Sequence, residues 1–188
     1  MIIGLTGACC SGKDTIAEYI SKKHGYKHYS LSDILREIMK EKGIELTREN
    51  LVAFGTELRE ENGNEILAKK VLEKIDLNGR FCITSIRHTG EVEKLRERKD
   101  FILVNITAPQ NMRFERMRNR KRGGDPQIFK KFTELEEKES QTKGHGQQLK
   151  KTADMADINF INYSNDMASL EIKVEKLLKD IKTNDNYV

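Results

Sequence analysis

The first fifteen residues constrain the fold of this chain more than any other segment. Residues 2–6 (Ile-Ile-Gly-Leu-Thr) form an apolar run that is typical of a strand buried on both faces. A loop bounded by Gly7 and Gly12 follows directly, and the apolar residues of segment 13–23 recur at helical spacing. A buried strand, a short loop and a helix in this order predict the opening unit of an α/β fold with a parallel sheet.

The loop itself matches a phosphate-binding pattern. It reads Gly-Ala-Cys-Cys-Ser-Gly-Lys from Gly7 to Lys13, which fits G-x-x-x-x-G-K, and this P-loop pattern requires a strand before it and a helix after it. Backbone N–H groups and the helix N-terminus bind the anion, while Lys13 reaches the β- and γ-phosphates and is a predicted catalytic residue. A chance glycine-rich turn is the alternative, and the agreement of strand, loop and helix disfavours it. We predict that ATP binds nine residues: Gly7, Ala8, Cys9, Cys10, Ser11, Gly12, Lys13, Asp14 and Thr15.

One position of the loop departs from the usual pattern and bears on metal binding. Asp14 stands where Ser or Thr normally contacts magnesium. A carboxylate also holds Mg²⁺, directly or through water, and Thr15 offers a hydroxyl beside it. We therefore predict that Asp14 and Thr15 hold the Mg²⁺ that accompanies ATP.

The rest of the chain repeats the alternation of strands and helices. Further strands are predicted at 26–29, 81–86, 101–106 and 158–161. Ser32 is the predicted N-cap of the second helix, and Pro109 is predicted to begin the helix after the fourth strand. Without an internal repeat or a long linker, residues 1–188 form one predicted domain, in which the tail 183–188 is expected to fray.

Composition narrows the function classes. The 34 basic residues barely exceed the 30 acidic ones, so a general nucleic-acid binder is not indicated. Three cysteines, Cys9, Cys10 and Cys82, show no metal or disulfide spacing, which favours a reducing compartment. No targeting segment and no apolar run of about 18 residues is visible, so we expect a cytoplasmic protein that does not span a membrane.

Several segments outside the P-loop resemble the adenylate-kinase-related P-loop kinases. They are 29–36 (Tyr-Ser-Leu-Ser-Asp-Ile-Leu-Arg), 47–51, 55–59, 85–88, 90–93, 113–116 and 156–157. The most similar branch is largely archaeal and is often grouped with dephospho-CoA kinases, while the Gly-Lys-Asp-Thr form of the loop also resembles some deoxynucleoside monophosphate kinases. The resemblance implies a P-loop NTPase with a five-stranded parallel sheet flanked by helices, a helical acceptor-binding segment at 32–75 and a small helical lid at 113–148.

One departure from the family concerns catalysis. Thr84 stands where the family commonly carries an Asp that helps to hold the magnesium water or the acceptor. Either catalysis is impaired, or Asp14 and Asp33 take over this work. By resemblance Asp33 orients the acceptor hydroxyl, and the alternative is that it stabilises the helix N-terminus.

Three arginines are candidates for binding an acceptor phosphate. Arg87 follows the strand 81–86 at the sheet edge where ligands bind in open α/β folds, and a surface ion pair is its alternative role. By resemblance, Arg36 and Arg59 clasp the acceptor with planar guanidiniums. Pairing with nearby carboxylates is equally compatible with the sequence, and the candidate partners are Glu37, Glu57 and Glu60.

The lid is predicted from a cluster of arginines. Arg113, Arg116 and Arg120 share one helical face, and Arg116 and Arg120 match the Arg-x-x-x-Arg that closes on the transferred phosphoryl group in kinase lids. A nucleic-acid patch is the rival interpretation, but the basic run from Arg116 to Arg122 contains no aromatic residue that could stack bases. We assign catalytic roles to Lys13, Arg87, Arg116, Arg120 and Asp33.

These features predict an ATP-dependent phosphotransferase. The expected acceptor is a small phosphate-bearing molecule, first a nucleoside or deoxynucleoside monophosphate, with dephospho-CoA as the alternative. A P-loop ATPase or nucleotide-binding regulator that transfers nothing to a small molecule is a third possibility, which Thr84 favours. The sequence leaves the oligomeric state open.

Overall fold

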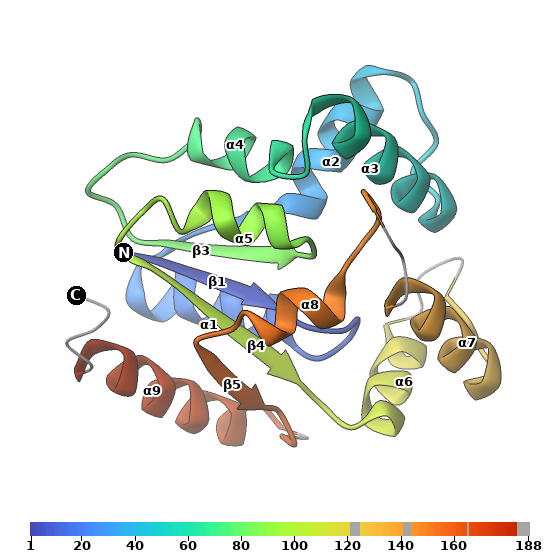
Figure 1. Cartoon of the computed structure of the whole chain (residues 1–188). Coiled ribbons are helices and arrows are strands. Elements are labelled where there is room, and N and C mark those ends of the chain that lie inside the picture. The colour runs from blue at the N-terminus through green and yellow to red at the C-terminus, as the bar shows by residue number, and fades with distance from the viewer. Residues whose placement is uncertain (121–124, 141–143, 165, 184–188) are drawn as a thin grey trace.

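The computed structural model describes residues 1–120, 125–140, 144–164 and 166–183. Its centre is a sheet of five parallel strands in the order β2-β3-β1-β4-β5 (Figure 1). The strands are β1 (Ile2–Thr6), β2 (Lys27–Ser30), β3 (Phe81–Ile86), β4 (Phe101–Thr107) and β5 (Ile158–Ile161). The sequence-based prediction of a five-stranded parallel sheet is confirmed.

Helices cover both faces of the sheet, as parallel strands require. They are α1 (Lys13–His24), α2 (Leu31–Glu41), α3 (Arg48–Asn62), α4 (Ile66–Leu72), α5 (Thr89–Leu95), α6 (Gln110–Asn119), α7 (Phe129–Ser140), α8 (Leu149–Asp154) and α9 (Met167–Thr183). One apolar cluster joins α2, α3, α4 and α5 to the sheet, and a second joins α1 and α9 to the other face. The α/β P-loop fold class predicted from the sequence is confirmed.

Alternate residues of β1 serve the two clusters. Ile2 packs into the α2–α5 cluster, whereas Ile3 and Leu5 pack into the α1–α9 cluster. All five β1 residues are buried, because helices cover both faces. The P-loop therefore begins at the carboxyl end of a strand that is held on both faces by the core.

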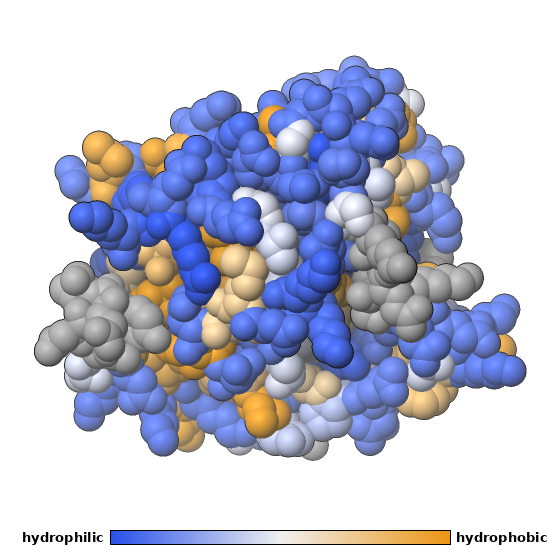
Figure 2. Space-filling model, in the orientation of Figure 1, coloured by the Kyte–Doolittle hydropathy of each residue, from blue (hydrophilic) through white to orange (hydrophobic). Residues whose placement is uncertain are grey.

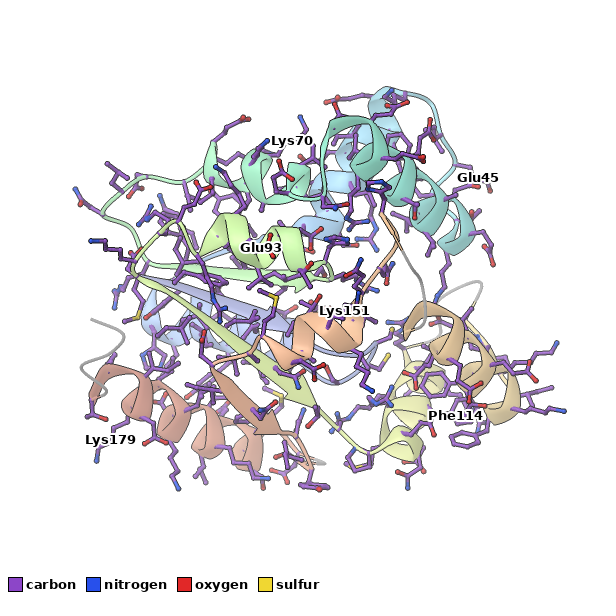
Figure 3. All side chains as sticks on the ribbon, in the orientation of Figure 1. Glu45, Lys70, Glu93, Phe114, Lys151 and Lys179 are labelled. Carbon is purple, nitrogen blue, oxygen red and sulfur yellow. The ribbon has the colours of Figure 1, made fainter. Side chains whose placement is uncertain are left out.

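The helices α6 and α7 lie beyond the arrow tips of the strands, away from both core layers (Figure 1). Phe114 on α6 is labelled in Figure 3. Its ring packs against those of Phe129 and Phe132 on α7, with centroid distances of 5.3 and 5.5 Å. This pair of helices falls within the segment that we expected to form a lid. Residues 121–124 and 141–143 of the segment expected to form a lid lie outside the described residues, as do residues 184–188 of the expected frayed tail.

Three boundary predictions are corrected by the structure. The N-cap of α2 is Ser30 rather than Ser32, because β2 runs directly into the helix with Ser30 still extended. The helical segment predicted at 32–75 consists of α2, α3 and α4, and its last helix ends at Leu72 rather than at residue 75. The helix α8 was not predicted, because Thr152 is its one buried residue and it therefore shows no apolar periodicity.

Hydrophilic residues cover most of the face seen in Figure 2, with hydrophobic residues in smaller groups. That surface is expected of a chain in which 34% of the residues are charged. Among the described helices, none combines the length and apolar character needed to cross a membrane.

Candidate functional site

The two glycines that bound the P-loop are required by close approaches of the backbone. Gly7 has φ 129°, and a Cβ there would lie 2.1 Å from the carbonyl oxygen of Ile106. Gly12 has φ 103°, and a Cβ there would lie 2.4 Å from Nδ2 of Asn162. Any larger residue would have to displace β4 or the loop after β5, so the loop conformation depends on both glycines.

Lys13 reaches back across this loop. Its side chain is 7% exposed, and Nζ donates to the carbonyl oxygens of Gly7 at 2.8 Å and Ala8 at 2.7 Å, and to Oγ of Ser11 at 3.3 Å. Burial, together with the nearby charge of Arg87, lowers the pKa of Lys13 to about 8. The ammonium is therefore held at the mouth of the loop, where the β- and γ-phosphates of a nucleotide bind in P-loop proteins.

A cavity of about 1150 Å³ opens in front of the P-loop. Its walls come from α1, α2, α3, the end of β3, α6 and the loop after β5. All of the predicted phosphate- and acceptor-binding side chains that carry charge line it, namely Lys13, Asp14, Asp33, Arg36, Arg59, Arg87, Arg116 and Arg120. Residues from segments more than 100 positions apart thus share one cavity, at the sheet edge where α/β proteins bind ligands.

Arg87 enters this cavity because of an irregularity in β3. Gly4 pairs with Ile83 and Thr6 with Ile86, so β3 holds one extra residue, and Ser85 has a left-handed φ of 63°. Such a bulge redirects the chain that follows it. The Nη1 of Arg87 then donates to Oε1 of Gln147 at 2.8 Å, a neutral partner that leaves the charge of Arg87 uncompensated in that contact.

Glu91 holds the backbone at the same turn. Its Oε2 accepts from the backbone N–H groups of Arg87 at 2.8 Å and His88 at 3.1 Å. Its Oε1 accepts from Nε and Nη2 of Arg59 at 3.2 and 2.8 Å. Arg59 is 4% exposed and Glu91 0%, so this is a fully buried ion pair. The expected glutamate partners Glu37, Glu57 and Glu60 were therefore wrong for Arg59, since the fold brings Glu91 from another segment.

Arg36 lies on α2 with its guanidinium only partly satisfied. Nη1 donates to Oδ1 of Asp33 at 2.7 Å, one helical turn away. Its Nε is buried without a hydrogen-bond partner among the described residues. A buried unpaired donor is costly, so Arg36 is suited to receive an anionic ligand. Its expected glutamate partners were also wrong, because Asp33 occupies that role.

The lid arginines have different partners. Arg116 donates to the carbonyl oxygen of Ser164 at 2.8 Å and, at 3.4 Å, to those of Cys10 and Ser11 in the P-loop. Arg120 pairs bidentately with Asp125 at 2.7 and 2.8 Å, and that hydrogen bonding raises its pKa. Arg116 is therefore part of the P-loop surroundings, whereas Arg120 is held by a carboxylate.

Arg113 shares their helix but not their site. It pairs with Glu136 on α7 and donates to the carbonyl oxygen of Ala108. It also lies over the ring of Phe132. It fastens α6 to α7 rather than lining the cavity.

The donor set at the start of α1 fits a magnesium ion. Asp14 is exposed and Thr15 half-buried, and both line the cavity beside Lys13. Mg²⁺ keeps several waters and takes one or two protein oxygens in addition to substrate phosphates, so a carboxylate and a hydroxyl suffice. Among the described residues, no cluster of three or more His, Cys, Asp and Glu side chains forms a complete cage.

Thr84 is fully buried and does not line the cavity. Its Oγ1 lies 2.9 Å from Nε2 of His28 on β2. The hydroxyl is therefore used by a neighbouring strand, and it offers no charge where the resembling kinases carry a carboxylate. His88, which follows Arg87, is buried at the N-cap of α5, where its Nδ1 accepts from the Gly90 N–H at 3.1 Å.

Three site residues were missed by sequence reasoning. Asn162 is 2% exposed, and its Nδ2 donates to the carbonyl oxygen of Ser11 at 2.9 Å, which ties the loop after β5 to the P-loop. Gln147 holds Arg87, and Asp125 holds Arg120. None of them belongs to a local motif, and the polarity of Asn162 directly after a strand is the one signal that pointed to it.

Comparisons with known proteins agree with this geometry. A family model described as an AAA domain matches residues 3–144. A UPF0200 protein of Thermococcus kodakarensis is 34% identical over 188 aligned residues, covering 96% of this chain and 98% of that one. The chain belongs to the AAA-domain family and to UPF0200.

Two other UPF0200 proteins are also similar to this chain over most of its length. The Methanocaldococcus jannaschii protein is 30% identical, with 100% of this chain and 95% of that one covered. A UPF0200/UPF0201 protein of Archaeoglobus fulgidus is 34% identical over 94% of this chain, which spans 53% of that protein. The expected archaeal P-loop family is therefore confirmed at the level of UPF0200.

Solved kinases share the fold of this UPF0200 protein. Shikimate kinase from Bacteroides thetaiotaomicron superposes with a TM-score of 0.63 and 16% identity, covering 97% of this chain and 98% of that one. A gluconokinase from Sinorhizobium meliloti gives a TM-score of 0.55 and 16% identity, covering 96% and 94%. At such identity the likeness establishes a kinase-like P-loop fold.

Proposed function

We propose that this UPF0200 protein is an ATP-dependent kinase whose acceptor is a small molecule that carries phosphate, most favourably a nucleoside or deoxynucleoside monophosphate. One observation carries the proposal. The P-loop with Lys13 and the arginines Arg36 and Arg87 line the same cavity, so a phosphate donor and a phosphate-bearing acceptor have adjoining cationic sites.

The donor side follows from the P-loop. Lys13 and the loop amides bind the β- and γ-phosphates, and Asp14 and Thr15 hold Mg²⁺, which neutralises charge that develops on the phosphates during transfer. Arg116 supports the loop from α6 through the carbonyl oxygens of Cys10 and Ser11. Phosphoryl transfer needs positioning and charge stabilisation above all, and this arrangement of cations supports both.

The acceptor side depends on Arg36 and Arg87. The unpartnered Nε of Arg36 and the charge of Arg87 suit a phosphate dianion, which accepts charge-assisted bidentate hydrogen bonds. Asp33 pairs with Arg36 when no acceptor is bound, and an acceptor phosphate would take over that pairing. The oxygen of a phosphate dianion attacks without a proton to lose, so Asp33 would accept a proton only from a hydroxyl acceptor such as dephospho-CoA. The buried Arg59–Glu91 pair forms the wall behind them rather than a third free cation. Dephospho-CoA also carries phosphates and remains the alternative acceptor.

A specific observation favours a second candidate function. Thr84 is hydrogen-bonded to His28 and offers no carboxylate, so the site lacks the residue that commonly helps to hold the metal water or the acceptor in the resembling kinases. A nucleotide hydrolase or nucleotide-binding regulator would need only the donor side. The two candidates differ in whether an acceptor stimulates ADP formation.

An acceptor screen distinguishes these candidates. ADP release from Mg–ATP is measured with nucleoside monophosphates, deoxynucleoside monophosphates, the matching uncharged nucleosides and dephospho-CoA. We expect a monophosphate to raise the rate well above the rate without acceptor, and its nucleoside to fail. Stimulation by dephospho-CoA alone would identify dephospho-CoA as the acceptor in place of a monophosphate. Steady ADP release that no acceptor changes would favour the hydrolase. Lys13→Ala is the control that must lose every rate.

A further inference from the structure

The P-loop of this chain contains two adjacent cysteines whose side chains touch. The Sγ atoms of Cys9 and Cys10 lie 3.8 Å apart, and both residues are half-buried and line the cavity. The third cysteine, Cys82, is fully buried in the sheet. Two accessible thiols thus sit within the phosphate-binding loop, and the chain offers a shielded cysteine for comparison.

The surroundings of Cys9 stabilise a thiolate. The hydrogen bond with the Cys10 side chain lowers the pKa of Cys9 to about 5 despite its burial, and the charges of Arg120, Arg87 and Arg48 act in the same direction. The pKa of Cys10 is raised because that thiol keeps its proton in the shared hydrogen bond. Arg87 and Arg120 line the same cavity as the sulfur. A thiolate in an electropositive, accessible site is the nucleophilic form of cysteine.

We propose that Cys9 is a site of reversible modification by small anionic disulfides, and that the adduct excludes nucleotide phosphates from the P-loop. The Cys9 thiolate attacks one sulfur of the disulfide, a new S–S bond forms to Cys9, and the original S–S bond breaks. The second sulfur leaves as a thiolate and takes a proton from solvent. A second thiol, as its thiolate, attacks the outer sulfur of the adduct, the Cys9 thiolate leaves, and the second thiol ends in a new disulfide with the removed group. That thiol supplies the electrons that restore Cys9, and no metal takes part.

The charge of the cavity selects the disulfide. The cations that would bind nucleotide phosphates also face Cys9, so an anionic reagent is drawn to the same place and a cationic one is repelled. Once attached, the anionic group lies between Gly7 and Gly12, in front of Lys13. Arg116 holds the carbonyl oxygen of Cys10 at 3.4 Å and keeps this part of the loop against α6. The adduct and a nucleoside triphosphate therefore compete for the same part of the cavity and for the same cationic side chains.

Labelling of the full chain tests the site. The protein is treated with dithiodipropionate, which is anionic, or with cystamine, which is cationic, and the labelled cysteine is located by peptide mass mapping. The reaction is run at pH 6, where an ordinary thiol is almost wholly protonated. We expect Cys9 to react at least about tenfold faster than Cys82 and faster with dithiodipropionate than with cystamine. Excess Mg–ATP should slow labelling, and dithiothreitol should remove the label.

Matched variants separate the two thiols. Cys9→Ser should abolish the fast label. Cys10→Ser keeps a hydroxyl donor and should keep most of the rate at pH 6, whereas Cys10→Ala removes the donor and should slow it about tenfold. The charged and titratable groups around the two thiols in this experiment are Cys9, Cys10, Lys13, Arg48, Arg87, Arg120 and the carboxylate Asp125, which pairs with Arg120 and opposes the effect of these cations. Equal rates in Cys10→Ser, Cys10→Ala and the unchanged chain would overturn the role of Cys10.

Three results would overturn the proposal as a whole. They are fast labelling at Cys10 instead of Cys9, a Cys9–Cys10 disulfide without any adduct, and a Cys9 adduct that leaves the affinity for a fluorescent ATP analogue unchanged. Exclusion of nucleotide rests on the donor half of the proposed function. An untreated chain that fails to bind the analogue would overturn that half and the exclusion together, while the mapping would still decide whether Cys9 is the modification site.

Discussion

The two ends of the cavity are built in opposite ways. The P-loop end is made by one contiguous stretch of the chain. Its shape is determined mainly by backbone conformation and by two glycines. The proposed acceptor end is lined by side chains from distant segments, among them Arg36, Arg87 and Gln147, and Arg87 donates to Gln147. The proposed donor site therefore depends on the local backbone geometry of the P-loop. The proposed acceptor site depends on which side chains the fold brings together.

The largest expected effect concerns the backbone end. Gly7→Ala places a Cβ 2.1 Å from the carbonyl oxygen of Ile106 at φ 129°, so we expect a loss of more than about 4 kcal/mol of unfolding free energy or no folded protein. Gly43→Ala is the matched control, since Gly43 has φ 68° with open space around it and should cost only about 1–2 kcal/mol. Urea unfolding measures both. Similar losses in the two variants would mean that the close approach is unimportant.

The next effect concerns the charge in the loop. Lys13→Ala should keep the fold and lower turnover by about a thousandfold, because stabilising charge is lost at the phosphates. For the unchanged protein, ATP affinity should be level below pH 8 and fall above it, because Lys13 with a pKa of about 8 then loses its proton. Lys13→Arg stays charged and should lack this fall. Titration of ATP binding from pH 6 to 10 decides the point.

At the proposed acceptor end, Arg87→Ala should raise the acceptor KM by a factor that corresponds to about 2–3 kcal/mol of lost acceptor binding. The ATP Kd should stay nearly unchanged. Gln147→Ala should raise the acceptor KM by a factor that corresponds to about 1 kcal/mol of lost acceptor binding, since it removes one hydrogen bond that orients Arg87. Arg96→Ala is a control, because Arg96 pairs with Asp157 and does not line the cavity. A loss of ATP affinity equal to the loss of acceptor affinity would contradict the division between the two ends.

The lid arginines lie between the two ends and should respond differently. Arg120→Ala should lower kcat by about tenfold or more while ATP affinity changes little, because Arg120 must leave Asp125 to reach the transferred phosphoryl group. Arg116→Ala should lower both, since Arg116 already contacts the P-loop carbonyl oxygens. Single-turnover rates and ATP titrations on both variants test this. A change confined to KM in both would rule out a role in transfer.

The smallest effect concerns the metal. Asp14→Asn should weaken ATP binding about tenfold, or 1.4 kcal/mol, with Mg²⁺ present and little without it, because the amide is a poorer ligand than the carboxylate. Binding is measured in Mg²⁺ and in chelator. An equal loss in both conditions would show that Asp14 has only a structural role.

The sequence by itself determined the sheet and the phosphate loop. Five buried apolar strands alternating with helices leave few topologies, and Gly7 to Lys13 form one continuous motif whose geometry depends on its own residues and on the strand before it. For the same reason the sequence identified Asp14 and Thr15 as the metal ligands to consider. These features depend on local order along the chain, which a sequence records directly.

Only the tertiary structure decided which charges are paired. Arg59 takes Glu91, Arg36 takes Asp33, Arg87 takes Gln147 and Arg120 takes Asp125. The sequence offered Glu37, Glu57 and Glu60 for Arg36 and Arg59, and three of the four observed partners come from another segment of the chain. Asn162 contacts the P-loop at Ser11, 151 positions away along the chain, and could not be predicted for the same reason. Long-range pairing depends on how the elements pack, and it decides which arginines remain available to bind a phosphate.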